Sequence, residues 1–64
     1  MSNKELYKIK LKKELVRINK IKNLNTSYIQ EIDFAGILIH TNSFDVADYE
    51  DCLGKLKNVP KSNS

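Results

Sequence analysis

The chain has 64 residues with a net charge of +3, and 41% of the residues are hydrophobic while 30% are charged. This length allows one small domain, and the composition is that of a folded protein and not of a disordered one. No apolar run approaches the roughly 20 residues of a membrane-spanning helix, and the basic start lacks the apolar segment of a signal peptide. The single Cys52 is typical of a reducing compartment. We therefore expect a cytoplasmic protein with one compact domain over residues 1–59 and a flexible tail over residues 60–64.

The residues that carry most enzyme chemistry are scarce in this chain. It has one histidine, His40, and one cysteine, and its two glycines stand far apart. A zinc site needs three or four Cys or His ligands, and a phosphate-binding loop needs several glycines in a fixed frame. A Cys52–His40 dyad is one alternative, but free cysteines are usually small core residues. The sequence predicts no catalytic site, no cofactor and no bound metal, with His40 at the surface.

The first predicted element is a helix from Asn3 to Lys22. Ser2 and Glu5 match the S-x-x-E capping box that begins many helices. Apolar residues then recur at helical spacing and form one stripe: Tyr7, Leu11, Leu15, Ile18 and Ile21. The alternation over residues 7–12 is also compatible with a strand of a hairpin, but Lys13-Glu14 lacks the residues that a tight hairpin turn requires. We therefore prefer the helix.

The middle of the chain is harder to assign. Residues 23–27 form a predicted loop because Asn, Thr and Ser side chains compete for backbone hydrogen bonds. Residues 28–41 are rich in isoleucine and aromatic residues, which favours strands. We expect two short strands, residues 28–32 and 37–41, joined by a turn over residues 33–36. A single helix with a Ser27/Gln30 capping box is the alternative, although Phe34 and Ile37 would then share a side with Gln30 and Thr41.

The last predicted element is a helix that begins after Asp45, a good N-cap residue. Its apolar residues have helical spacing: Val46, Tyr49, Cys52, Leu53 and Leu56. Carboxylates lie near its start and Lys55 and Lys57 near its end, as the helix dipole favours, and Pro60 follows. The predicted fold is therefore a small α+β domain with the order α-β-β-α, and a three-helix bundle is the alternative.

Charge is distributed unevenly along the chain. Residues 1–25 hold eight cations and two carboxylates, a net of +6, whereas residues 26–64 have a net of −3. A lysine-rich helix can bind nucleic acid through phosphate contacts, or it can simply be a solvated face. Because seven of the eight cations are lysines and base reading relies mostly on Arg, Asn and Gln, we place nucleic-acid binding second.

An acidic cluster begins the last helix. It consists of Asp45, Asp48, Glu50 and Asp51. The frame of a calcium-binding loop is absent, so compensation of the helix dipole is the better explanation. The same carboxylates could also mimic phosphates toward a basic protein partner.

A four-residue stretch, QEID at Gln30–Asp33, resembles part of the SQELD motif of the small helical-hairpin aspartyl-phosphate phosphatases. Ile29 stands where that motif has serine, and the distance from the first helix is several residues too short. No residue role is carried over from that family.

The function that these features favour is a small non-enzymatic regulator or inhibitor that binds another protein. Three apolar residues, Leu6, Ile9 and Val16, lie opposite the predicted core stripe of the first helix and would form a second apolar strip. The cations predicted to surround this strip at a partner interface are Lys8, Lys12, Lys13, Arg17 and Lys20. Burial of the strip in a homodimer is an alternative.

Amino-acid usage points to the origin of the gene. Ile, Lys and Asn supply 24 of the 64 residues, and their codons are rich in A and T. This bias is typical of an AT-rich genome such as that of a phage, a plasmid or a low-GC bacterium.

Overall fold

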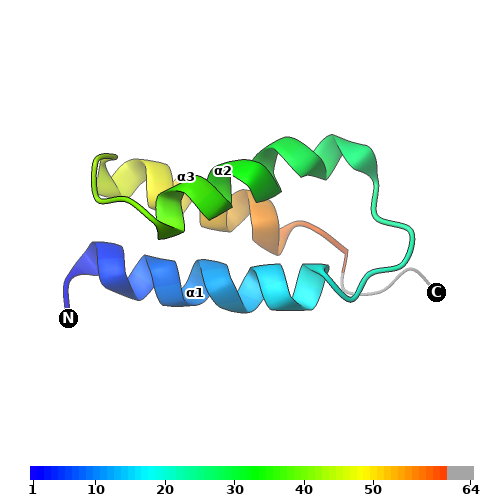
Figure 1. The fold of residues 1–64 in the computed structure, drawn as a ribbon, viewed down its shortest axis with the longest axis horizontal. Coiled ribbons are helices and arrows are strands. Elements are labelled where there is room, and N and C mark those ends of the chain that lie inside the picture. Colours follow the sequence, from blue (N-terminus) through cyan, green and yellow to red (C-terminus); the bar gives the residue numbers. More distant parts are fainter. Residues whose placement is uncertain (61–64) are drawn as a thin grey trace.

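The computed structural model describes residues 1–60, and within that range every regular element is helical (Figure 1). Helix α1 spans Asn3–Ile18, helix α2 spans Ile29–Ile39 and helix α3 spans Val46–Lys57, with a short 3₁₀ turn, η1, at Thr26–Tyr28 ahead of α2. The chain runs along α1, returns along α2 and reverses again into α3, which lies behind the other two helices in Figure 1. The predicted α-β-β-α order is therefore wrong, and the alternative of a three-helix bundle is confirmed.

The two predicted strands are replaced by α2, and the reason lies in packing. Ala35 and Leu38 are fully buried and Ile32 packs against the core, which places one apolar residue on the inner face at each turn. The prediction treated Ala35 as part of a turn and gave weight to the strand preference of isoleucine. Burial between α1 and α3 overrides that preference, because propensity is weaker than tertiary context.

The start of α2 also differs from the helical alternative that the sequence offered. Tyr28 is the N-cap residue and its side chain makes no capping hydrogen bond, so the Ser27/Gln30 box does not form. Instead, the Asn25 side chain accepts a hydrogen bond from the Ser27 N–H at 2.9 Å. The turn η1 then leads directly into the helix.

Helix α1 begins as predicted and ends four residues earlier. The Ser2 hydroxyl accepts a hydrogen bond from the Glu5 N–H at 3.2 Å, which is the N-capping half of the predicted box. After Ile18 the backbone tightens, because Ile21 N–H donates to the Ile18 carbonyl in the i-to-i−3 pattern that closes many helices. This turn directs Ile21 back against the core.

Helix α3 follows the prediction closely. Asp45 is its N-cap, and Asp45 and Asp48 form a reciprocal capping box. The predicted apolar face is buried at Tyr49, Cys52, Leu53 and Leu56, and Val59 beyond the helix is buried as well. Residues 61–64, most of the predicted tail, lie outside the described residues.

The core of the bundle lies where the inner faces of the three helices meet. From α1 it takes Leu11 and Ile18, from α2 Ala35 and Leu38, and the remainder from α3 and Val59. Within residues 1–60, no helix is both long enough and apolar enough to cross a membrane.

Candidate interaction surface

The outer face of α1 carries the apolar strip that the sequence predicted. We call Leu6, Ile9 and Val16 the outer strip; their exposed fractions are 42%, 40% and 60%. They are exposed because the opposite side of the same helix, with Leu11 and Ile18, already fills the core. The structure thus separates an inner apolar face from an outer one on a single helix.

Two of the α1 lysines are bound within the molecule. Lys4 Nζ donates to the backbone carbonyl of Asn42 at 2.8 Å, and Lys8 Nζ donates to the Asn42 side-chain oxygen at 2.6 Å. Lys8 also lies 3.5 Å from a Glu5 carboxylate oxygen, and its side chain is only 12% exposed. Of the predicted partner-binding cations, Lys8 is therefore the least accessible, and it fixes the loop between α2 and α3 to α1.

Arg17 likewise makes intramolecular contacts. Its guanidinium donates to the backbone carbonyls of Leu56 at 3.0 Å and Pro60 at 3.1 Å and pairs with Glu14 at 2.9 Å. The last carbonyls of a helix lack partners within the helix, and a cation there also complements the helix dipole. Arg17 therefore ties the end of α3 to α1, and Pro60, the first residue of the predicted tail, is part of this connection.

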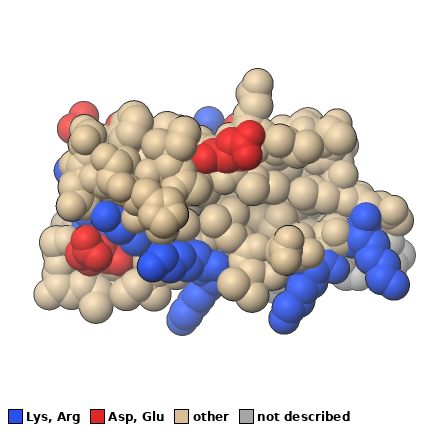
Figure 2. All heavy atoms as spheres, in the orientation of Figure 1, with Lys and Arg blue, Asp and Glu red and all other residues tan. Residues whose placement is uncertain are grey.

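The basic surface that remains is smaller than the sequence indicated. Lys10 Nζ lies 5.6 Å from the centre of the Tyr7 ring, within cation–π range. Lys12, Lys13 and Lys20 are exposed, and no hydrogen bond or ion pair engages them in the described part of the chain. Figure 2 shows basic side chains gathered along the edge of the molecule that α1 forms.

The acidic cluster at the start of α3 is also occupied by contacts within the fold. Asp45 and Asp48 cap the helix, and Asp51 pairs with Lys55 at 3.3 Å. Glu50 accepts a hydrogen bond from the Tyr7 hydroxyl at 2.9 Å, and this hydrogen bond raises the pKa of Tyr7. No group of three or more potential metal-binding side chains occurs in residues 1–60.

Cys52 and His40 have separate environments. Cys52 is buried, its thiol lies 3.6 Å from the Glu31 carbonyl oxygen, and burial raises the pKa of the thiol. A buried thiol with a raised pKa is a poor nucleophile because the thiolate is the reactive form. His40 is exposed at the end of α2.

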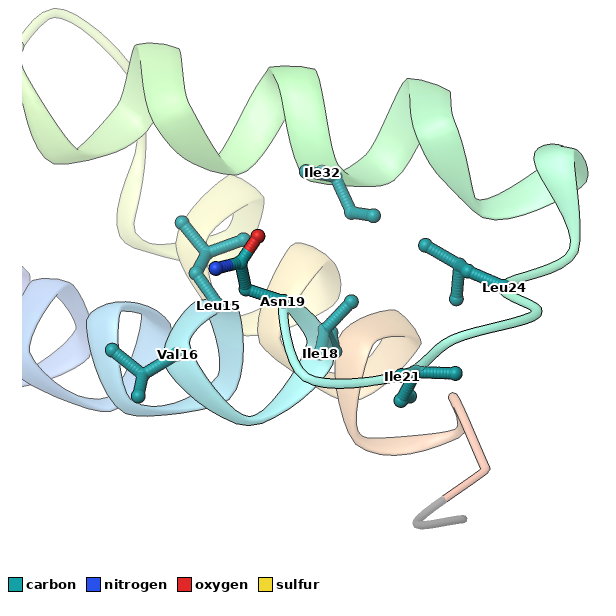
Figure 3. A pocket seen from close by; sticks show the side chains of 7 residues that line it. All are labelled: Leu15, Val16, Ile18, Asn19, Ile21, Leu24 and Ile32. Carbon is teal, nitrogen blue, oxygen red and sulfur yellow. The ribbon is translucent and has the colours of Figure 1, made fainter. Parts of the chain in front are cut away.

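An apolar groove opens between the end of α1 and the start of α2 (Figure 3). It has a volume of about 450 Å³ and is lined by Leu15, Val16, Ile18, Asn19, Ile21, Leu24 and Ile32. Figure 3 shows Ile32 descending from α2 toward Leu15 and Ile18 of α1, while Leu24 and Ile21 close the far side. We call this feature the α1–α2 groove.

Sequence reasoning did not find this groove. The sequence predicts Leu15, Ile18 and Ile21 in the core stripe and Ile32 in a strand. The groove depends on where α2 crosses α1, which a helical period alone does not specify. The outward isoleucines of α2, Ile29 and Ile37, which are 47% and 54% exposed, were missed for the same reason.

No known protein-family model matches the chain, and no curated protein and no solved structure matches it either.

Proposed function

We propose that this chain is a small regulatory protein that acts by binding another protein through the outer side of α1. The observation that carries the proposal is the outer strip, whose three apolar side chains are exposed although the same helix also supplies the core. An apolar patch surrounded by charged residues has the anatomy of a protein interface. The setting is cytoplasmic, in keeping with a single, buried and unpaired cysteine.

The neighbours of the strip support a protein partner. Val16 has Lys12 and Lys13 one turn before it on α1, and Lys20 lies in the turn that follows the helix. Lysines at the rim steer encounter with an oppositely charged partner, while desolvated apolar residues determine how long the complex lasts. An apolar centre with lysines around it therefore favours a protein partner, whereas a uniformly basic face would favour a nucleic acid.

The test is affinity capture from host lysate with and without nuclease, using the wild-type chain and the Ile9→Ser/Val16→Ser variant. We expect a nuclease-resistant partner that the variant loses, because the substitutions remove apolar contact area. A matched control is Ile37→Ser, which changes an isoleucine on α2 whose exposure lies between those of Ile9 and Val16 and should leave capture unchanged. A partner that the double variant retains would contradict the proposal, and size-exclusion chromatography with light scattering would reveal a homodimer instead.

Nucleic-acid binding is the second candidate, because Lys12, Lys13 and Lys20 are exposed and have no partner in the described part of the chain. With Lys4, Lys8 and Arg17 held by internal contacts, few phosphates can be neutralised. We expect weak binding whose dependence of log affinity on log salt has a slope of about −0.9 per phosphate contact. Replacing the three lysines by glutamine should then remove most of that slope.

A further inference from the structure

From the α1–α2 groove and the lysines that flank Val16 of its α1 wall, we infer a docking site for an acidic amphipathic helix of a protein partner. This inference rests on the proposed function and specifies the chemistry of the partner. The groove volume of about 450 Å³ lies in the range of clefts that enclose ligand groups. Its lining is aliphatic apart from the Asn19 side chain at the rim.

The two walls of the groove differ in charge. On the α1 wall, Lys12 and Lys13 lie one turn before Val16 on the helix, and Lys20 lies in the turn that follows the helix. On the α2 wall, the residues one turn away from Ile32 carry no charge: Tyr28, Ile29, Ala35 and Gly36. The charged residues next to Ile32 are the carboxylates Glu31 and Asp33, so no cation lies beside it on this wall. A complementary partner therefore has an apolar face with carboxylates along one edge.

The spacing of the lysines sets the spacing of the carboxylates. From Lys12 to the end of the helix at Ile18, α1 rises about 9 Å, and Lys20 follows in the turn just beyond that end. A partner helix that lies along the groove spans the same distance in about two turns. Its apolar residues one turn apart would enter the groove between Leu15 and Ile32, as anchors do in helix-in-groove recognition.

A second copy of this chain fits the groove poorly. Symmetric dimers place the same surface of both subunits together, which would juxtapose two α1 helices from segments with a net charge of +6 each. The carboxylates of α3 are engaged by helix capping, Tyr7 and Lys55. The occupant that the charges favour is thus a different, acidic chain.

The experiment titrates the full-length, isotope-labelled protein with synthetic helical peptides and follows its amide resonances by NMR. The acidic probe has leucines one turn apart and glutamates two turns apart on one edge. One control peptide has lysine in place of each glutamate, and a second has serine in place of each leucine. We expect the acidic probe to shift the amides of Ile21, Leu24 and Ile32, to bind about tenfold more tightly than the lysine peptide, and to lose binding when its leucines are replaced.

Variants test each part of the inference without disturbing the core. Lys12→Gln/Lys13→Gln/Lys20→Gln should remove the preference for the acidic peptide, and Val16→Ser should weaken binding of that peptide. Ile37→Ser should leave it unchanged, because Ile37 does not line the groove.

Three outcomes would overturn the inference: no binding at about 1 mM peptide, which is a very weak interaction; equal binding of the acidic and basic peptides; or shifts confined to residues outside the groove. The inference would also be overturned if the free protein were a dimer in which a second copy of the chain already covers the groove. Failure of the proposed function has a separate signature, which is retention of the lysate partner by Ile9→Ser/Val16→Ser.

Discussion

The two ends of the helical bundle are built differently. At the end that contains the loop between α2 and α3, which we call the loop end, hydrogen bonds fix the loop: Lys4 and Lys8 bind Asn42, and the buried Tyr49 donates its hydroxyl proton to the Thr41 carbonyl. At the opposite end, which we call the groove end, α1 and α2 are separated by the apolar groove.

This difference indicates which end is available to a partner. At the loop end the polar groups already have partners within the chain, so a binding protein would have to replace them. At the groove end, Leu15, Val16, Leu24 and Ile32 are at least partly exposed, and Arg17 ties α1 to the end of α3. Covering apolar surface there gains free energy at roughly 25 cal/mol per Å².

The largest expected effect separates core from groove. Leu11→Ala removes a fully buried side chain and should lower the free energy of unfolding by about 2–5 kcal/mol. Leu15→Ala, in the half-buried groove wall, should cost clearly less because solvent already reaches the site. Urea unfolding followed by circular dichroism measures both values, and equal costs would show that the groove is closed in solution.

At the loop end, Tyr49→Phe removes one hydroxyl and leaves the ring in place. The Thr41 carbonyl then loses its donor, so the free energy of unfolding should fall by about 0.5–1.5 kcal/mol. Tyr28→Phe is the matched control nearer the groove end, since no hydrogen bond engages the Tyr28 hydroxyl in the described part of the chain. If both variants had wild-type stability, the loop end would not be held as described.

At the groove end, Arg17→Gln should lower the free energy of unfolding by about 1 kcal/mol, because Leu56 and Pro60 lose a shared donor. The expected structural consequence is faster hydrogen exchange in the last turn of α3, measured by NMR. Lys20→Gln, at an exposed position in the turn after α1, should change neither quantity. An unchanged exchange rate in the Arg17 variant would contradict the role assigned to this side chain.

A smaller effect tests the helix that the sequence did not predict. Gly36 lies inside α2 with a negative φ, and a methyl group there would meet no atom within 4 Å. Gly36→Ala should therefore raise the free energy of unfolding by about 0.5–1 kcal/mol. In the rejected model, Gly36 lies in a turn between two strands. If that turn needs the conformational freedom of glycine, Gly36→Ala would lower the free energy of unfolding, so a destabilised variant would favour the strands.

The sequence predicted α1 and α3 because their signals are local. Ser2 and Asp45 cap these helices as expected, and apolar residues recur at helical spacing in both. Helix α2 has few charges and several β-branched residues, so its local signal favoured strands. Its helical state depends on burying Ala35 and Leu38 against two helices distant in sequence, which no local pattern reveals.

The candidate site was also predictable only where its signals are local. The outward position of Leu6, Ile9 and Val16 follows from the period of α1 alone. The internal contacts of Lys8 and Arg17 join residues 34 to 43 positions apart, and the groove requires α2 in its place. These features could not be predicted because they depend on tertiary packing.

The most direct test of the account is covalent footprinting of the complex that the chain forms with its captured partner, compared with the free protein. A small aliphatic-labelling reagent reports the solvent exposure of individual side chains, and the free protein provides the reference. The account predicts that the partner protects Val16, Leu24 and Ile32 at the groove end and leaves Phe44 at the loop end unchanged. Protection confined to the loop end or to α3, with the groove residues labelled as in the free protein, would contradict it.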